Sequence, residues 1–392
     1  MKQERFSFKE NTLYMCGHSL GPMPKQAQKI IERCLKDWAQ EGVLAWNKSD
    51  WIHLPYKMGQ LIAPLIGAKE DEVIVCDSTS VNLFKVLHSA LRLNPKRRII
   101  ITSSGNFPAD LYIAQGIAHF NNNIELCYVP DDSNNIIESL TEEVAVLTLA
   151  HVDYRTGLIY DMREITERAH ELGIIVVWDL SHSVGVVPLS LTKDNIDFAV
   201  GCTYKYLNGG PGAPSFVYAN RRHHKNLVCP IYGWIGHRAP FTFSKSFENT
   251  PGVGAFLGGT PYILSMKALE GALGVFDDIV IERLYKDTIN NGNYLIDLLN
   301  QKVPELVCVS SRVLGERGGH IAFKHDQAYA ISRALIAEDL ICDYRNPDLI
   351  RLSMPSLYLD LHDMQKASLI IEKVIRDKLY QKAEFQQKLF VT

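Results

Sequence analysis

Seven short apolar runs between residues 73 and 218 constrain the fold of this chain more than any other feature of its sequence. The runs are apolar throughout, which is typical of strands covered on both faces in a mostly parallel sheet. They lie at 73–76, 99–102, 124–129, 144–149, 174–178, 198–202 and 215–218. Helical stretches at 80–92, 108–120 and 161–172 alternate with them. We therefore predict an α/β domain whose ligand lies at the carboxyl ends of the strands.

The segments on either side of this sheet have a different pattern. Apolar residues at helical spacing predict a first helix, which starts after Pro22 and Pro24 and ends near Gly42. After Pro261 longer amphipathic helices, at 262–302, 327–338 and 362–380, alternate with short strands at 320–323 and 350–353. We expect an N-terminal segment (1–55) packed with a small α+β domain (262–392), and a large α/β domain between them (56–261).

Composition excludes several classes of protein. The 41 basic and 44 acidic residues give a net charge of −3, without the basic excess of most nucleic-acid binders. Basic clusters at 96–98 and 221–225 adjoin apolar strands and are better explained as solvated loops. No apolar run approaches the roughly 18 residues of a membrane span. Charges of both signs at 1–5, with no apolar run after them, argue against a secretory signal. We expect a cytoplasmic protein that contacts neither membrane nor nucleic acid.

The eight cysteines are scattered, and no two of them form a Cys-x-x-Cys pair. Several lie inside apolar runs, as Cys76 and Cys202 do. Small reduced core residues account for them better than a disulfide framework or a metal site. We predict no metal centre.

Two residues predict the chemistry. Asp179 ends an apolar strand, and Lys205 follows 26 residues later between two tyrosines, before Gly209 and Gly210. Alone, the aspartate could be a strand cap and the lysine a solvated surface charge. Together they are what a pyridoxal phosphate (PLP) enzyme needs. The lysine amine forms a Schiff base with the cofactor aldehyde, and the aspartate keeps the ring nitrogen protonated.

Further residues have the types and positions that such a site needs. Thr79 and Ser80 open a predicted helix after a strand, where they cap the helix or bind a phosphate. Phe107 follows the next strand and either stacks on a pyridine ring or joins the core. His182 lies against the cofactor or is structural. Arg351, on a strand of the tail, grips a substrate carboxylate or is an exposed edge charge.

Motifs for rival chemistry are missing from the sequence. There is no Gly-x-x-x-x-Gly-Lys-Ser/Thr loop and no His-Glu-x-x-His pair. Gly252 and Gly254, ahead of Gly258 and Gly259, are spaced too irregularly for a dinucleotide fingerprint and indicate a loop.

At this point the chain resembles the kynureninase family, in its bacterial type. The resemblance rests on blocks that keep their order over nearly the whole chain, at 17–21, 78–85, 106–112, 178–183, 201–212, 233–237 and 259–261. The run from Gly201 to Gly212 and the Gly-Trp-x-Gly-His block distinguish kynureninases from cysteine desulfurases and other class V aminotransferase-like enzymes. The resemblance implies PLP fold type I (aspartate aminotransferase-like), and a homodimer with active sites at the subunit interface.

The resemblance also assigns roles to residues. Lys205 becomes the Schiff-base lysine, Asp179 the partner of the ring nitrogen, and Phe107 the ring-stacking residue. The implied phosphate contacts are Thr79, Ser80, Tyr204 and Trp234, with Thr260 near the phosphate or substrate. Asp110 and His182 complete the cofactor shell, and Arg351 binds the substrate carboxylate. The positions that mark the bacterial type, Trp46 and Gly259, belong to the substrate pocket.

The chain departs from the family at two positions. His18 stands where the family has Asn, and Ala150 stands where it has Thr or Ser beside the cofactor. Ala150 cannot hydrogen-bond the ring, so a contact of about 1 kcal/mol is either lost or supplied by water.

The implied reaction is hydrolysis of L-kynurenine to anthranilate and L-alanine, in tryptophan catabolism or NAD precursor synthesis. Weaker activity is expected on 3-hydroxy-L-kynurenine, and Tyr204 is the candidate proton donor. Two alternatives stay open. A cysteine desulfurase would need a mobile-loop thiol, whereas Cys308 and Cys342 lie in apolar runs. An inactive relative that works as a binding module would have no need of Lys205.

Overall fold

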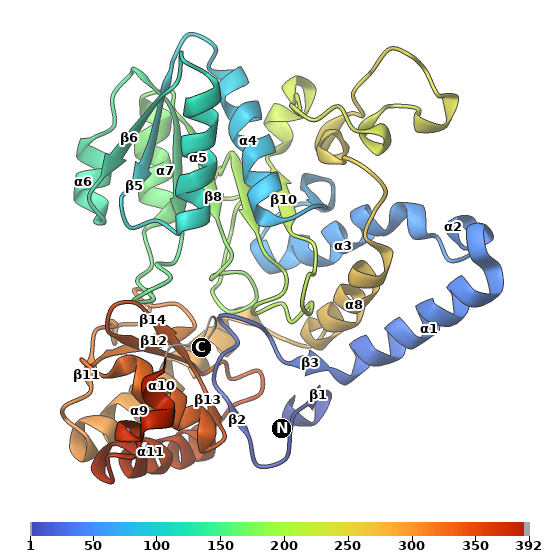
Figure 1. Ribbon diagram of the computed structural model, residues 1–392. Coiled ribbons are helices and arrows are strands. Elements are labelled where there is room, and N and C mark those ends of the chain that lie inside the picture. The colour runs from blue at the N-terminus through green and yellow to red at the C-terminus, as the bar shows by residue number, and fades with distance from the viewer. Residues whose placement is uncertain (1, 388–392) are drawn as a thin grey trace.

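A seven-stranded sheet forms the centre of the protein, as seen in the computed structural model (Figure 1). The structure describes residues 2–387. Residues 388–392 lie outside that range, and so does Met1, the first residue of the segment 1–5 that was considered as a secretory signal. The strand order is β4 (Val73–Val75), β10 (Phe216–Ala219), β9 (Phe198–Gly201), β8 (Ile175–Asp179), β7 (Val144–Ala150), β5 (Ile99–Ser103), β6 (Glu125–Val129). Strands β9, β8, β7, β5 and β6 are parallel, and β10 is antiparallel to β4 and β9. All seven predicted strands and the α/β class are confirmed.

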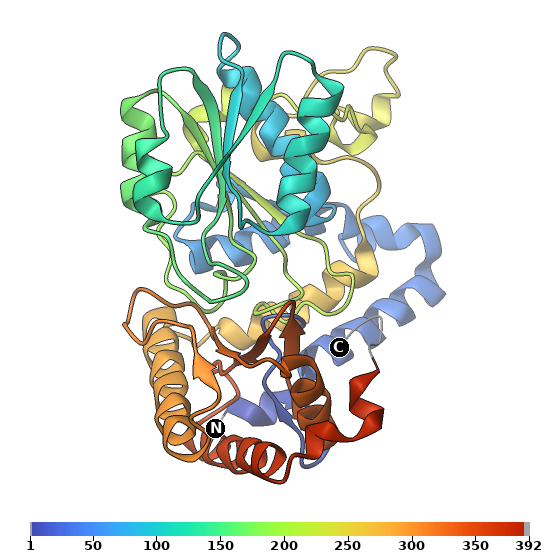
Figure 2. The ribbon, with the colours of Figure 1, turned by 60° about the vertical axis from the view of Figure 1, so that its left-hand side comes forward.

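Helices cover both faces of this sheet, as its apolar strands require (Figure 2). Side chains alternate along β8: Val176 and Trp178 join the core on one face, and Val177 joins the core on the other. The first core includes side chains of α3 (Leu54–Ile62) and α7 (Met162–Glu171), and the second those of α4 (Thr79–Leu93) and α5 (Pro108–Phe120). Full burial of one valine or leucine side chain stabilises a fold by roughly 1.5–3 kcal/mol, so two-sided burial fixes each strand in the sheet.

The first predicted helix is confirmed as α1 (Lys25–Glu41), which starts after Pro24 and ends at Gly42. It packs closely on α8 (Ile263–Leu273), where a Cβ on Gly271 would lie 2.5 Å from the Cα of Ala27. Part of its apolar stripe stays uncovered within the chain, because Leu35 and Trp38 are 44% and 58% exposed.

The C-terminal part is α+β, as predicted. Its antiparallel sheet has the order β11 (Val307–Cys308), β12 (His320–Lys324), β15 (Leu349–Ser353), β14 (Asp343–Arg345). The helices are α9 (Ile281–Lys302), α10 (Ala328–Ala337) and α11 (Leu361–Arg376). The predicted stretch 262–302 is not one helix: a 3-10 turn at Gly274–Phe276 and an extended Val280 separate α8 from α9.

The N-terminal segment crosses to this C-terminal part. Strand β2 (Leu13–Tyr14) pairs in parallel with β13 (Leu340–Ile341), so residues 13–19 lie beside the tail (Figure 1). The remaining short elements are α2 (Ala45–Lys48), α6 (Ser133–Glu138), α12 (Ala383–Gln386), β1 (Phe6–Ser7) and β3 (Met23–Pro24). The three-part division at 55 and 261 stays a prediction.

No helix within residues 2–387 is both long and apolar enough to cross a membrane. The eight cysteines are unpaired, and most of them are buried. Burial raises the pKa of the Cys76 thiol to about 12, so it stays protonated. The cysteines therefore behave as core residues, as expected from their scattered positions.

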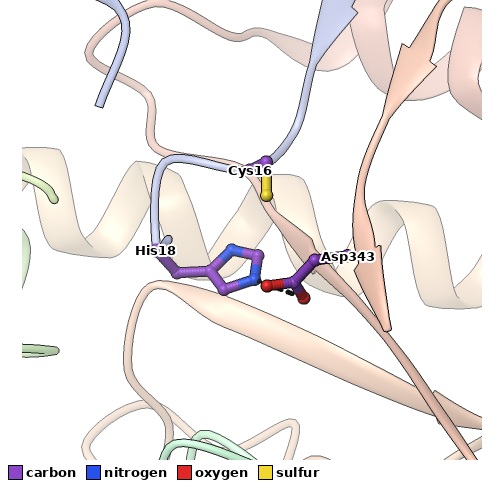
Figure 3. Close-up of side chains that lie close together, drawn as sticks. All are labelled: Cys16, His18 and Asp343. Atoms are coloured by element: carbon purple, nitrogen blue, oxygen red, sulfur yellow. Dashed lines mark hydrogen bonds and ion pairs between the residues drawn. The ribbon is translucent and has the colours of Figure 1, made fainter. Parts of the chain in front are cut away.

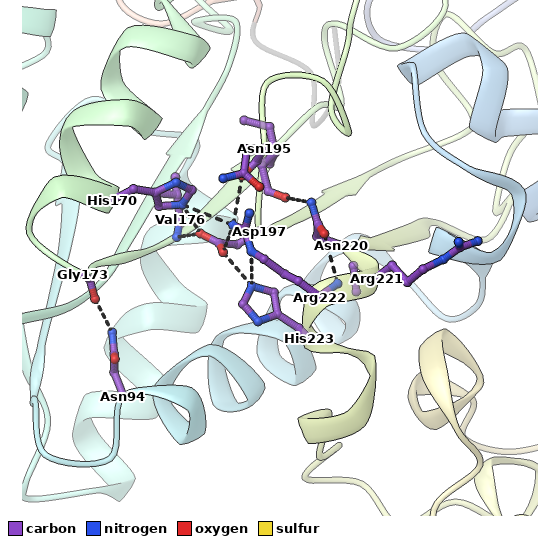
Figure 4. A network of polar contacts seen from close by, with 12 residues as sticks. Asn94, His170, Gly173, Val176, Asn195, Asp197, Asn220, Arg221, Arg222 and His223 are labelled. Atoms are coloured by element: carbon purple, nitrogen blue, oxygen red, sulfur yellow. Dashed lines mark hydrogen bonds and ion pairs between the residues drawn. The ribbon is translucent and has the colours of Figure 1, made fainter.

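A buried carboxylate ties the elements together at the edge of the sheet opposite the strands' carboxyl ends (Figure 4). Asp197, just before β9, accepts hydrogen bonds from His170 Nε2 at 2.8 Å, His223 Nε2 at 2.6 Å, the Val176 amide at 2.9 Å and Arg222 Nη2. Burial alone would raise the pKa of Asp197, but the two histidine hydrogen bonds and the Arg222 charge hold it well below its usual range. Four segments thus share one anion.

We predict that Asp197→Ala lowers the free energy of unfolding by about 3 kcal/mol, the low end for breaking a buried charge pair. The low end applies because the Arg222 side chain is 31% exposed and can be hydrated. Urea unfolding of the holoenzyme measures the effect as a lower midpoint. Arg163→Ala, which removes an exposed ion pair with Glu167 on α7, should leave the midpoint in place. An unchanged midpoint in Asp197→Ala would contradict the tying role.

Candidate active site

A cavity lies at the carboxyl ends of the parallel strands, as predicted from the strand pattern. Its walls come from the ends of β7 and β8, the segment after β9, and the first turns of α4 and α5. The lining residues are Thr79, Ser80, Phe107, Ala109, Asp110, Ala150, Val152, Tyr154, Asp179, Ser181, His182, Tyr204 and Lys205. The structure therefore brings Lys205, Asp179 and most of the other predicted cofactor residues into one place.

Lys205 is buried at this cavity. Its Nζ lies 3.0 Å from His182 Nε2, and 5.7 and 5.8 Å from the ring centroids of Phe107 and Tyr204. Burial, followed by the charge of Lys205, lowers the pKa of His182 well below its usual value. His182 is therefore neutral and can accept a hydrogen bond from the lysine amine.

Asp179 is held rigidly because it ends β8, between β7 and β9. Its Oδ1 accepts hydrogen bonds from the Ser181 amide at 2.8 Å and the Ser181 hydroxyl at 2.6 Å. Burial raises the pKa of Asp179, while Ser181 and Lys205 lower it. Burial and the Asp179 charge raise the pKa of neighbouring Asp110 well above its usual value. The proton of this pair thus resides on Asp110, and Asp179 stays a carboxylate.

The start of α4 offers an anion site, with Thr79 and Ser80 in its first turn. Ser78 caps the helix by accepting from the Val81 amide at 3.4 Å, and the other first-turn amides are available to a phosphate. Asp77, just before it, has a left-handed backbone conformation (φ +43°), and its carboxylate forms an ion pair with the buried Lys85. Lys85 also donates to the Phe256 carbonyl at 2.6 Å.

Arg351 is buried on β15, behind the cavity wall, and is not an exposed edge charge. Its Nε donates to Asp343 Oδ1 at 2.8 Å, and its Nη2 to Asp343 Oδ2. Its Nη1 donates to the backbone carbonyl of Tyr154, a residue that lines the cavity. The guanidinium thus lies next to the cavity wall, but one of its edges is already engaged.

Besides Arg351, four predicted site residues lie outside the cavity of a single chain. The Trp46 ring packs edge-on at 5.8 Å against Trp51. Trp234 is 44% exposed, and its Nε1 donates to the Pro240 carbonyl at 2.9 Å. Gly259 and Thr260 are exposed. One chain alone does not assemble every predicted contact.

Sequence reasoning missed several residues of the site. Tyr154 lines the cavity, and its ring meets Phe107 edge-on at 5.1 Å. Ser181, which orients Asp179, was visible as a hydroxyl two residues after the strand end. The role of Lys85 could not be recognised from the neighbouring residues, because its ion-pair partner Asp77 lies more than two helical turns away along the chain. Ala150 does line the cavity, where the family has a hydroxyl.

Comparison with known proteins agrees with this geometry. The family described as Aminotransferase class-V matches residues 51–340. A kynureninase of Burkholderia mallei (strain ATCC 23344) is 37% identical and covers 100% of this chain and 95% of its own length. A kynureninase of Pseudomonas fluorescens is 36% identical with the same coverage. The chain belongs to the kynureninase family. The family assignment confirms the resemblance and the predicted cofactor, PLP.

Solved structures confirm the fold alone. A cysteine desulfurase from Thermococcus onnurineus NA1 superposes with a TM-score of 0.81 at 17% identity, covering 96% of this chain and 97% of its own. A C-DES variant with glycine covalently linked to its PLP cofactor gives 0.82 at 18% identity, covering 94% and 98%. The predicted PLP fold type I is thereby confirmed.

The residues of the cavity fit PLP. Two buried atoms, Asp110 Oδ2 and His182 Nδ1, have no hydrogen-bond partner among the described residues, as expected where a polar ligand belongs. An anion site at α4, a carboxylate at Asp179 and an amine at Lys205 match the phosphate, ring nitrogen and aldehyde of the cofactor.

We predict that borohydride reduction of the PLP-loaded protein fixes the cofactor to Lys205, because its amine is the one that faces the cavity. Peptide mass mapping should find the added mass on the peptide that contains Lys205. Lys205→Ala should still take up PLP through the phosphate contacts but lose it on denaturation after reduction. Label on Lys85, the other buried lysine among the described residues, would contradict the assignment.

Proposed function

We propose that this member of the kynureninase family hydrolyses L-kynurenine to anthranilate and L-alanine. The observation that carries the proposal is the joint presence of Lys205, His182 and Asp179 in one cavity, in a chain related to bacterial kynureninases over its full length. We further propose that the reaction belongs to tryptophan catabolism or NAD precursor synthesis and takes place in the cytoplasm.

The cavity residues divide the work of holding the cofactor. Thr79, Ser80 and Tyr204 hold its phosphate, Phe107 covers its ring, and Asp179 keeps the ring nitrogen protonated. When bound, PLP withdraws electrons from the α-carbon of the substrate and so makes its proton acidic. Asp110, which carries the proton of the carboxyl pair, donates a hydrogen bond and keeps Asp179 in place.

The proton transfers fall to Lys205 and Tyr204. The Lys205 amine, once it is no longer bonded to the cofactor, removes the α-proton of the substrate. Neutral His182, whose Nε2 lies 3.0 Å from Lys205 Nζ, accepts a hydrogen bond from the resulting ammonium. Water adds to the side-chain ketone, the bond between that carbon and the β-carbon breaks, and the ring portion leaves as anthranilate. Burial raises the pKa of Tyr204, so its phenol stays protonated and can deliver the proton that completes alanine.

The alternatives kept open by the sequence lack support in the structure. A cysteine desulfurase needs a thiol that reaches the substrate, yet Cys308 and Cys342 line no part of the cavity. Cys342 is 2% exposed, and burial raises its pKa well above the usual value. A binding module without catalysis would have no use for a buried lysine beside a neutral histidine.

We also propose a homodimer in which Trp46, Trp234, Gly259 and Thr260 complete the partner's cavity. Trp234 and the 259–260 turn are exposed, and Leu35 and Trp38 on α1 leave an apolar stripe uncovered. A set of binding residues that one chain leaves incomplete is what a shared site would produce. An active holoenzyme that light scattering finds to be a monomer would refute the shared site.

Asp179→Asn tests the reaction. A neutral amide cannot keep the ring nitrogen protonated, so we predict that kcat for L-kynurenine falls by more than about tenfold, or roughly 1.4 kcal/mol of barrier. Cofactor affinity should change much less, because the phosphate contacts remain. Asp179→Glu, which keeps the charge, is the matched control and should retain more activity. Anthranilate release can be followed by fluorescence, and a rate within tenfold of wild type would refute the role.

We predict that kcat/KM for L-kynurenine exceeds that for 3-hydroxy-L-kynurenine. An indole at Trp46 leaves the extra hydroxyl without a partner, at a cost of roughly 1–3 kcal/mol, about 5–150-fold. Thr260 is the one hydroxyl expected nearby. Trp46→His should narrow the difference, whereas Phe120→His, at a 90% exposed position on α5, should not. Equal kcat/KM values in the wild type would defeat this preference.

A further inference from the structure

Cys16, His18 and Asp343 form a buried cluster between the N-terminal segment and β14 (Figure 3). Their ligand atoms all lie within 4.8 Å of one another, the only such grouping of His, Cys, Asp and Glu among residues 2–387. A divalent cation would nevertheless meet two arginines there. Arg351 binds both carboxylate oxygens of Asp343, and Arg345 lies 3.1 Å from it. The cluster must have another use than metal binding.

Asp343 is the centre of a hydrogen-bond network that ends on Arg351. His18 Nε2 lies 3.0 Å from Asp343 Oδ1, and the Ser19 hydroxyl donates to Oδ2. Burial would raise the pKa of Asp343, but His18 and Arg351 together hold it well below its usual range. Asp343 is therefore a permanent anion with all its acceptor sites used.

This network determines which edge of the Arg351 guanidinium is paired with a carboxylate and which has only neutral partners. A guanidinium offers two bidentate edges, Nε/Nη2 and Nη1/Nη2. Asp343 occupies the first edge. The second meets the Tyr154 carbonyl and, at 3.1 Å, the Ser19 hydroxyl. Because Tyr154 also lines the cavity, the edge that Asp343 does not occupy faces a segment of the cavity wall.

His18 supplies the part of this network that is peculiar to the chain. Burial lowers the pKa of His18 to about 4, so the ring is neutral and donates to Asp343 through Nε2–H. Its Nδ1 then has no partner among the described residues. The ring stacks on His320 at 5.2 Å, and His320 lies 5.5 Å from His182.

We propose that His18, acting through Asp343, is a positioning residue that fixes the Nη1/Nη2 edge of Arg351 for the substrate carboxylate. The proposal rests on the carboxylate role given to Arg351 above and adds the device that orients it. His18 is fully buried and is not among the residues that line the cavity. Its removal should therefore weaken substrate binding without slowing the bond-breaking steps.

The test compares His18→Leu, which keeps bulk but removes the donor, with His18→Gln, whose amide nitrogen can replace Nε2. Each PLP-loaded variant is assayed for KM and kcat with L-kynurenine. A spectral titration with L-alanine gives a dissociation constant that does not depend on turnover. Cys34→Ala, at a buried cysteine on α1 whose charged neighbours are Lys267, Asp37 and Glu270, is the matched control. Arg351→Ala reports on the carboxylate role itself.

We expect His18→Leu to raise KM and the L-alanine dissociation constant about tenfold, with kcat within about twofold, as for a lost hydrogen bond to an ion. His18→Gln should restore both constants, and the resting spectrum should be that of the wild type. Should His18→Leu fail to fold, His18→Ala with added imidazole gives the same comparison, because the free base can refill the cavity.

Three results would overturn the proposal: unchanged constants in His18→Leu, equal impairment in His18→Gln, or an altered resting spectrum with reduced kcat. The last would mean that His18 acts on Lys205 through His320 and His182. Failure of the underlying function is a separate observation, namely that Arg351→Ala leaves KM for L-kynurenine unchanged. An effect in Arg351→Ala without one in His18→Leu refutes the His18 role alone.

Discussion

The carboxylate of Asp179, at the buried end of β8, is the interaction on which the rest of the site depends. A charge can stay ionised there only because Ser181 donates two hydrogen bonds, Lys205 lies nearby and Asp110 takes the proton of the pair. The neighbouring strands β7 and β9 hold the backbone that carries it. Burial in the apolar sheet thus disfavours the ionised form of Asp179, while the same sheet holds its carboxylate in a fixed position and direction.

The parts of this structure that follow from local sequence were predictable. Continuous apolar runs gave every strand of the large sheet, because a strand buried on both faces has no polar position to alternate with. Asp179 and Lys205 could be placed in one cavity because parallel strands end at a common edge. The order of the strands and the antiparallel direction of β10 carry no such local signal. The break between α8 and α9 was missed, although Gly274 and the adjacent Asp277 and Asp278 interrupt the apolar pattern there.

The surroundings of Arg351 could not be predicted for a different reason. Arg351 itself was recognisable on its strand, but its partners other than the Tyr154 carbonyl come from two further segments, at Ser19 and Asp343. They meet because β2 pairs with β13 across more than 320 residues. Each of these two strands has only two residues, which is too short for an alternating apolar pattern that would reveal the pairing in the sequence. The departure at His18 was visible as a difference from the family, yet its meaning depends on Asp343, which only the folded chain brings within hydrogen-bond reach.

The same long-range pairing explains how one chain can bind both ends of an amino acid substrate. Cofactor groups belong to the rigid sheet, whereas Arg351 belongs to the C-terminal part, and the Arg351–Tyr154 hydrogen bond joins the two. A substrate carboxylate that takes this edge of Arg351 replaces a neutral carbonyl by an anion, which strengthens the hydrogen bond to the guanidinium. Under the proposed role of Arg351, substrate binding would gain free energy at the junction between the two parts, with the α-carbon on the Lys205 side. Since Asp343 already neutralises Arg351 in the free protein, the arginine can be fully buried and still available on its second edge.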